Sequence, residues 1–216
     1  MAVQVIPLKC PSCKAGLCGF DRDSVFFCAY CRMGWEFGAE GNPRPLQMAY
    51  AKPLLRPDKF KLIFYLPFYH HRVSLVSGSE YIPEHLAAEL PRRFANVYVP
   101  GYRLIRESYF GELGLIYTES GVILEEDLNV PEKERCRIGA AIRAPAETEP
   151  YLKYYPLLII DKRSDITGKN FEFQSWFQKI WAVPFYDLGE QIQEGITGKT
   201  FPAISLDSIS EFRESG

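Results

Sequence analysis

Three things are scarce in this sequence: histidine, long apolar runs and an excess of charge of either sign. The chain has only 3 histidines. Its longest uncharged apolar stretch, residues 62–69, is well short of the ~20 residues that a membrane-spanning helix needs. The formal net charge is −2, so no overall positive field draws the chain to nucleic acid or to an acidic membrane.

The first residues also lack the pattern of a secretory signal. Residues 1–10 contain no charged start, no long apolar run and no cleavage pattern. We therefore expect a cytoplasmic protein in a reducing compartment, without a transmembrane segment. A chain with 47% hydrophobic residues can bury a core without disulfides. Paired cysteines in that setting favour a metal site.

The motifs of common catalytic sites are absent as well. The sequence has no nucleophile elbow, no dinucleotide-binding glycine pattern and no two-histidine metal motif. Residues 195–200 look like a phosphate-binding loop, but two residues separate the glycines where four are needed. His70 and His71 are neighbours in a predicted strand, so their imidazoles should point to opposite faces. These absences favour a protein that is not an enzyme, although they leave that class open.

What the sequence does contain is two closely spaced cysteine pairs. Cys10 and Cys13 form one Cys-x-x-Cys pair, and Cys28 and Cys31 form the other after a spacer of fourteen residues. A two-residue gap lets a tight turn bring both sulfur atoms of a pair to one ion, and the spacer has the length of a hairpin. Zinc takes four tetrahedral ligands and thiolates suit it, so we predict a Zn²⁺ site, with iron as the less favoured metal.

Residues 8–37 resemble a zinc ribbon of the transcription-factor and rubredoxin-like type. Both cysteine pairs of such ribbons sit on knuckle turns, so the resemblance implies that these four cysteines are the metal ligands. Many knuckles have glycine directly after the second cysteine, whereas Lys14 and Arg32 stand there in this chain. Four thiolates leave no open position for a reacting water, so the metal should be structural. We expect the remaining cysteines, Cys18 and Cys136, to be small buried residues.

We predict an α+β fold in which an N-terminal four-cysteine zinc ribbon precedes a β-rich mixed domain with two or three short helices. The ribbon should span residues 1–40, and a proline-rich linker should span residues 41–59. The larger domain should follow over residues 60–205, with residues 206–216 as a tail. The boundary rests on the prolines of the linker, because proline restricts its own backbone and that of the preceding residue.

Hydrophobic periodicity and turn residues predict the elements of the larger domain. The clearest amphipathic pattern runs from Phe173 to Trp181, where apolar residues recur at helical spacing. The expected elements are strands over 60–76, 97–106 and 151–160, a meander of short strands over 111–124, helices over 83–95, 131–142 and 173–181, and a final hairpin that contains 196–201.

Three stretches share an apolar-Pro-x-Tyr pattern, at residues 66–69, 99–102 and 183–186. Two turns, 166–171 and 196–201, also match each other. This repetition indicates a diverged duplication of strand–helix–strand units, and proline predicts that the motifs lie at sheet edges. In its layout, a cysteine ribbon before a β-rich domain with repeated Pro-aromatic strands, the chain resembles a loose group of bacterial zinc-ribbon proteins with no assigned function.

These observations favour a zinc-binding, non-enzymatic interaction or assembly protein with a structural four-cysteine site and an aromatic docking surface for an unidentified protein partner. The candidate partner-binding residues are Trp35, Phe37, Trp176 and Trp181. One alternative is a nucleic-acid-associated zinc-ribbon protein of transcription or replication, although the cationic and acidic residues of positions 1–40 balance. The other is a rubredoxin-like iron electron carrier, or an enzyme with a structural ribbon.

Overall fold

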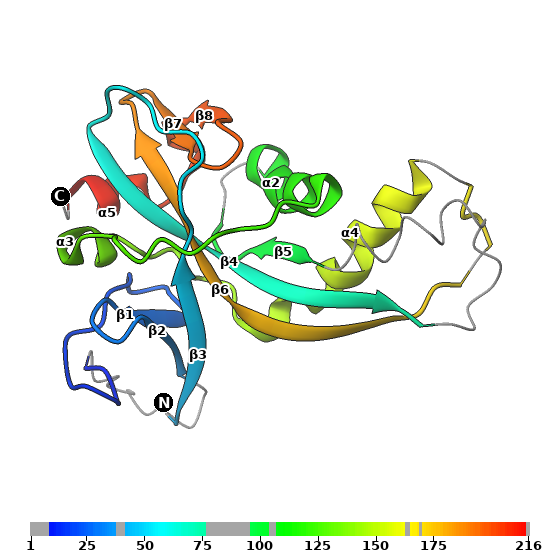
Figure 1. Ribbon diagram of the computed structural model, residues 1–216, viewed down its shortest axis with the longest axis horizontal. Helices are drawn as coiled ribbons and strands as arrows, with labels where there is room; N and C mark the ends of the chain where they lie inside the picture. Colours follow the sequence, from blue (N-terminus) through cyan, green and yellow to red (C-terminus); the bar gives the residue numbers. More distant parts are fainter. Residues whose placement is uncertain are drawn as a thin grey trace.

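Two long antiparallel strands form the centre of the protein. The computed structural model describes residues 9–37, 42–76, 96–103, 107–162, 165–168 and 170–214. Strands β4 (Leu62–Leu75) and β6 (Phe173–Asp187) cross the molecule side by side (Figure 1). They pair from Leu62 opposite Asp187 to Leu75 opposite Phe173, with an irregularity between His70 and His71.

Shorter strands extend this pair into one mixed sheet. The strand order is β1-β2-β3-β6-β4-β5, with β7 beside β6 and β8 beside β7. Strand β3 runs parallel to β6, while the other neighbours are antiparallel. The shorter strands are β1 (Val25–Cys28), β2 (Met33–Phe37), β3 (Pro43–Tyr50), β5 (Val97–Pro100), β7 (Gln191–Glu194) and β8 (Thr200–Pro202).

A few helices join the strands, so the protein belongs to the predicted α+β class. They are α2 (Glu107–Ser120), α3 (Glu132–Arg135), α4 (Glu149–Asp161), α5 (Ile209–Glu214) and the 3₁₀ turns η1 (Pro145–Thr148) and η2 (Ala203–Ser205). None of the helices in the described ranges combines the length and the hydropathy needed to cross a membrane.

The central strands are buried on both faces. Phe64 and Phe68 of β4 lie in the cluster that also contains residues of α2 and α5. Tyr65 and Tyr69 lie in a second cluster with residues of α4, β1 and β3. Because neighbouring side chains of a strand point to opposite faces, an element between two clusters has an almost continuous apolar sequence, as residues 62–69 have.

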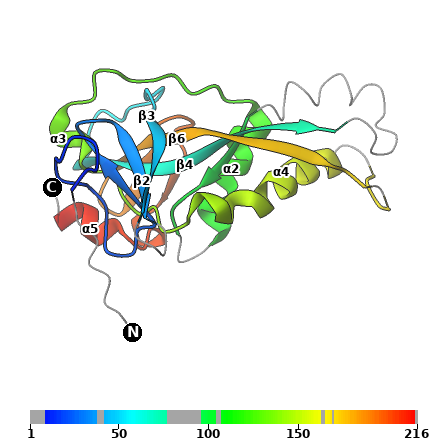
Figure 2. The ribbon, with the colours of Figure 1, turned by 90° about the horizontal axis from the view of Figure 1, so that it is seen from below.

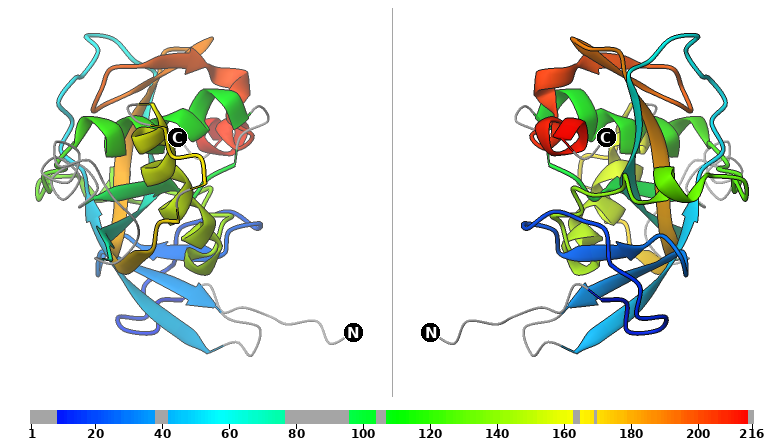
Figure 3. Two further views of the ribbon diagram at one scale, coloured as in Figure 1. Left: turned by 90° about the vertical axis from the view of Figure 1, so that its right-hand side faces the viewer. Right: turned by 90° about the vertical axis from the view of Figure 1, so that its left-hand side faces the viewer.

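The far ends of β4 and β6 leave the sheet as a two-stranded arm (Figure 2). Strand β3 pairs with β6 only at residues 180–182, and β5 pairs with β4 only at 68–71. Helix α4 supports the arm, because Ile159 and Ile160 pack against Leu75 and Phe173. Away from the arm, β1 to β3 lie at one end of the body, and β7 and β8 lie at the opposite end (Figure 3).

The predicted helix over residues 173–181 is wrong, because these residues belong to β6. All 14 residues of β4 pair with β6, and this long-range pairing decides the conformation. Apolar residues occur on both faces of β6, so their spacing also matched a helix. Periodicity alone does not separate these two cases in an apolar run.

The predicted meander over 111–124 and the predicted strand over 151–160 are also wrong. The first segment is largely α2, in which Gly114 allows a close approach to β5 and makes no turn: an added Cβ would clash with the Tyr98 carbonyl oxygen. The second segment is α4. Its buried residues are Leu152, Tyr155, Pro156, Ile159 and Ile160, which is a helical spacing that the β-branched residues and Pro156 concealed.

Other element predictions are confirmed in whole or in part. The strands expected over 60–76 and 97–106 correspond to β4 and β5, and the final hairpin is formed by β7 and β8. The helix expected over 131–142 is reduced to the short α3. The helix expected over 83–95 lies outside the described residues.

Two proline motifs lie at the centre of the sheet, which corrects the expectation that they mark its edges. Leu66 pairs directly with Val183, so the two motifs adjoin at their first residues and extend from there in opposite directions. Pro67 precedes the residues that pair with β5, and Pro184 lies between the residues that pair with β3 and those that pair with β7. Each proline therefore occupies a position where a neighbouring strand ends and no ladder N–H is needed.

The surroundings of these two prolines are alike. The carbonyl oxygens of Pro67 and Pro184 accept hydrogen bonds of 2.9 Å from the N–H groups of Gly101 and Gly195. An added Cβ on Gly101 would meet Tyr69, and one on Gly195 would meet Pro184. This likeness supports the predicted duplication, which stays a prediction.

The predicted linker and tail contain regular structure. Strand β3 lies within residues 41–59 and connects the two parts of the sheet, because residues 43–47 pair with β2 and residues 48–50 pair with β6. Helix α5 lies within residues 206–216, and its buried Phe212 stacks on Phe64 with a centroid distance of 4.5 Å. The division of the chain into domains stays a prediction.

Candidate metal centre

The second cysteine pair lies in the turn of the β1–β2 hairpin. Cys28 is the last residue of β1, and β2 begins two residues after Cys31. The first pair lies in the preceding loop, which returns along β1: Cys18 and Phe27 exchange backbone hydrogen bonds of 2.7 and 2.8 Å. This pairing brings the two cysteine turns together, as the hairpin-length spacer predicted.

Both cysteine turns have the same backbone geometry. The N–H of Lys14 donates to the Cys10 carbonyl at 2.9 Å, and the N–H of Arg32 donates to the Cys28 carbonyl at 2.8 Å. Lys14 and Arg32 have φ angles of 67° and 56°, in the left-handed region that favours glycine. These are the two positions where the ribbons that this segment resembles often have glycine. The fold thus keeps the turn even though both residues carry side chains.

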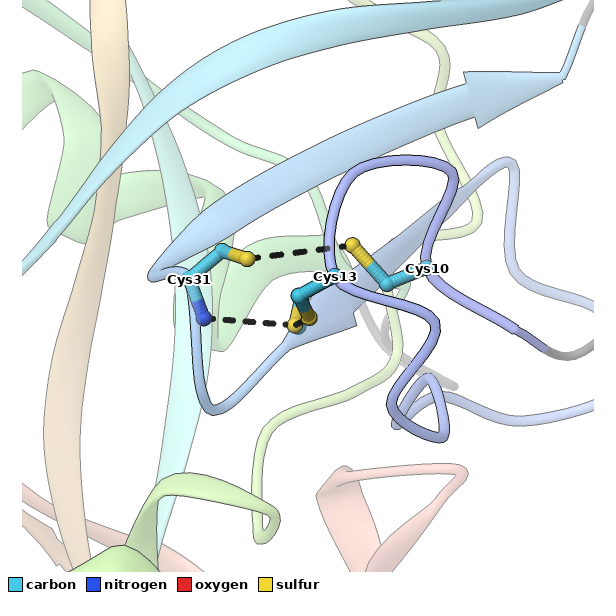
Figure 4. Close-up of side chains that lie close together, drawn as sticks. Cys10, Cys13 and Cys31 are labelled. Atoms are coloured by element: carbon cyan, nitrogen blue, oxygen red, sulfur yellow. Dashed lines mark hydrogen bonds between the residues drawn. The ribbon is translucent and has the colours of Figure 1, made fainter.

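The four sulfur atoms converge on one point. The Sγ atoms of Cys10, Cys13, Cys28 and Cys31 all lie within 4.8 Å of one another. Cys10 and Cys31 are 3.9 Å apart at Sγ (Figure 4), and Cys13 and Cys28 are 3.5 Å apart. Tetrahedral zinc with Zn–S bonds of about 2.3 Å requires S···S separations of about 3.8 Å. The thiols are free, so the donor set and its spacing fit a four-coordinate thiophilic ion.

Hydrogen bonds and burial give the cluster unequal pKa values. At Cys10, burial opposes ionisation, but the backbone N–H groups of Cys13 and Ser12 and the nearby thiols outweigh it and lower the pKa to about 7. Hydrogen bonding to Cys13, followed by burial, raises the pKa of Cys31 to about 12. One thiolate therefore forms readily and opposes further ionisation. A cation at the centre removes this conflict, because it stabilises all four thiolates.

The cluster has a small apolar surround and a tie to the segment before α3. Cys10 and Cys28 are fully buried beside Trp35, and Cys13 and Cys31 are half-buried. The N–H of Cys31 donates to the Cys28 sulfur at 3.3 Å. Arg32 donates to the Leu128 carbonyl at 2.9 Å, which links the second cysteine turn to the segment before α3.

The four predicted partner-binding aromatics have different positions. Trp35 is 8% exposed within the cysteine cluster, and Trp181 is 6% exposed in the core beside β4. Phe37 is half-buried and meets Phe26 edge to face. Trp176 is 52% exposed on the arm. The structure thus brings the four cysteines together, places Trp35 and Phe37 at this cluster and leaves Trp176 and Trp181 on β6. The role of these aromatics in partner binding stays a prediction.

Two exposed residues near the cysteine cluster were not among the predicted ones. Tyr30, inside the second cysteine turn, is 71% exposed, and Leu128 is 63% exposed. Both neighbour the contact between Arg32 and the Leu128 carbonyl. Tyr30 could have been noticed from the sequence, because the middle residues of a Cys-x-x-Cys turn point away from the ion.

The remaining candidate ligands do not join the cluster. His70 bonds to Asn96 through Nε2 at 2.8 Å, and His71 bonds to Thr148 through Nε2 at 3.0 Å. Cys18 is half-buried and Cys136 is exposed, so the expectation that both are buried is wrong for Cys136.

No protein-family model matches this chain, and no curated protein or solved structure matches it significantly. The class of site therefore rests on geometry. The protein has an α+β fold with a four-cysteine cluster at its β1–β2 hairpin, consistent with a zinc-ribbon-like site and able to bind a metal ion such as zinc.

Proposed function

We propose that this protein is a zinc-binding, non-enzymatic interaction protein that uses a structural four-cysteine site to hold a docking region in shape. The observation that carries the proposal is the convergence of four sulfur atoms within 4.8 Å of one another. Four thiolates complete the tetrahedral shell of zinc, so no position is left for a substrate or a reacting water. The metal then acts on the fold and takes no part in a reaction.

Exposed aromatic and aliphatic side chains supply the surface for a partner. Tyr30, Leu128 and Trp176 are each more than half exposed, and tyrosine and tryptophan are enriched among the residues that contribute most of the binding free energy at protein interfaces. Tyr30 lies between two metal ligands, so the ion would fix its backbone. We therefore propose that Tyr30 and Leu128 form the zinc-dependent part of the docking surface.

Metal analysis of the purified protein tests the first half of the proposal. We expect one zinc per chain, bound in a colourless protein, and loss of that zinc in Cys13→Ser and Cys31→Ser. Cys136→Ser is the matched control, since this thiol is exposed and outside the cluster, and it should retain full metal content. Strong visible absorption with bound iron would instead favour the rubredoxin-like alternative.

Partner capture tests the second half. A protein retained by the wild type should be lost with Tyr30→Ser and with chelator. It should be kept with Ile204→Ser, because Ile204 is at least as exposed as Tyr30, at 79% against 71%. If Tyr30→Ser and Ile204→Ser behave alike, the docking proposal is wrong even when zinc is bound. Retention of nucleic acid, weakened by salt, would favour the nucleic-acid alternative.

A further inference from the structure

A pocket of about 360 Å³ lies apart from the cysteine cluster and has an unusual charge. Among the described residues, its lining contains three arginines, Arg22, Arg103 and Arg143, and a single acidic residue, Glu147. Three guanidinium groups and one carboxylate leave a local charge of +2, although the whole chain carries −2. Like charges gathered in one concave site repel one another unless an anion occupies it.

The three arginines come from distant parts of the chain. Arg22 lies between the two cysteine pairs, Arg103 follows β5, and Arg143 precedes η1. Backbone contacts hold these segments together: Ser24 donates its N–H to the Ala141 carbonyl at 2.7 Å, and its hydroxyl to the Ile142 carbonyl at 2.9 Å. The convergence is therefore a product of the tertiary fold.

Arg143 is held in place before any ligand arrives. One of its terminal nitrogens donates to the Pro100 carbonyl at 2.7 Å, and its guanidinium lies over the Tyr151 ring at 4.8 Å. Its backbone N–H donates to the Gly101 carbonyl at 3.0 Å. A guanidinium has five N–H donors, so a fixed Arg143 still has donors for a ligand and loses little entropy on binding.

The other charged residues leave the site available. Arg103 is exposed and makes no hydrogen bond, ion pair or ring contact within the described ranges. Arg22 reaches Asp207 at 3.4 Å, but its side chain is 69% exposed, and such surface pairs are weak. The Glu147 carboxylate accepts the Ala144 N–H at 2.6 Å, which satisfies it without any of the arginines.

We propose that this pocket binds a small molecule through a phosphoryl or diphosphoryl group. Guanidinium groups bind phosphate oxygens with two parallel hydrogen bonds, and a dianion matches the local charge. The pocket volume falls within the range of small-molecule sites, about 300–1,000 Å³. Tyr102 and Ile142 add an apolar wall for the body of the ligand. This site does not depend on the docking proposal.

Titration of the zinc-loaded, full-length protein with inorganic pyrophosphate and with phosphate, at constant ionic strength, tests the proposal by calorimetry. We expect saturable binding of one pyrophosphate per chain. Arg103→Gln should weaken it about tenfold or more, because one charge-assisted contact is lost. Arg103 has no structural partner in the described ranges, so the variant should keep the wild-type melting temperature.

Arg72→Gln is the matched control, since Arg72 is an exposed arginine of β4 outside the pocket lining, and it should leave the affinity unchanged. Absence of saturable binding, or equal affinity in Arg103→Gln and the wild type, would overturn the proposal. A single-stranded oligonucleotide that displaces pyrophosphate, and whose affinity falls equally in both variants, would also overturn it, since the charge would then act as a diffuse nucleic-acid surface.

Discussion

The cysteine cluster and the β4–β6 pair are stabilised by different means. The buried members of the cysteine cluster are Cys10, Cys28 and Trp35, too few to offset the entropy of ordering the surrounding loops. The clusters on the two faces of β4 and β6 contain many more buried apolar residues, including stacked Phe64 and Phe185. One region should therefore depend on its ion, and the other on burial of apolar surface.

Metal removal should cause the largest difference in stability between the two regions. Structural zinc contributes about 10–16 kcal/mol of apparent binding free energy in zinc-finger peptides, and this is coupled to folding. Chelation, or Cys28→Ser, should unfold the two cysteine turns while β4 and β6 stay folded. Strand β1 should keep part of its protection, because Val25 and Phe27 lie in the core cluster that contains Tyr65. Hydrogen exchange measures this by region. Loss of amide protection in both regions would show that β3 makes them a single cooperative unit.

A cavity in the central sheet should destabilise β4 and β6 and leave the metal site intact. Phe64 is fully buried between Phe185 and Phe212, so Phe64→Ala should cost about 3–5 kcal/mol of unfolding free energy. Denaturant unfolding followed by far-ultraviolet circular dichroism gives the change. Zinc content below the transition should stay at the wild-type level. Loss of zinc under those conditions would contradict the separation of the two regions.

Asp23 connects the two regions in a pH-dependent way. Burial raises its pKa from 3.8 to about 7, although the N–H groups of Phe20, Ala141 and Ala140 oppose the shift. The folded state therefore binds this proton more tightly than the unfolded chain. The protonated Asp23 carboxyl therefore stabilises the fold fully below pH 3.8, and this stabilisation is lost as the pH rises through about 7.

Asp23→Asn should remove this loss, because the amide stays neutral and can still accept the Phe20 N–H. At about 1.4 kcal/mol per pKa unit, the variant should exceed the wild type by roughly 2–4 kcal/mol at pH 8, and by less at pH 6. Urea unfolding of the zinc-loaded proteins at both values measures the difference. A gap between the two proteins that does not change with pH would contradict the assignment to Asp23.

The smallest effect concerns the left-handed residues of the cysteine turns. At position 14, where φ is 67°, Lys14→Gly should be more stable than Lys14→Ala by about 1 kcal/mol. At the exposed Lys52, whose φ is not positive, the order should reverse, since glycine loses more entropy on folding. Thermal unfolding of the four zinc-loaded variants compares the two positions. The same order at both positions would argue against backbone strain at the turn.

Sequence predictions were correct where residues close in the sequence set the structure, and wrong where pairing between distant segments set it. The cysteine turns and their approach to each other were predicted because their geometry is set by residues close in sequence. The conformation of Phe173–Trp181 was predicted wrongly because it is set by pairing with β4 across about a hundred residues. The meander expected over 111–124 was wrong for the same reason, since the Tyr98 carbonyl that requires a glycine at position 114 belongs to another element.

The sequence by itself determined that two cysteine pairs could close on one ion, because a two-residue gap and a hairpin-length spacer define that geometry locally. It also showed the repeated proline motifs, without showing that Leu66 and Val183 pair with each other. Only the tertiary structure brought Arg22, Arg103 and Arg143 to one pocket. The physical reason is that a charge cluster assembled from distant segments leaves no periodic or spacing pattern along the chain, whereas a metal knuckle does.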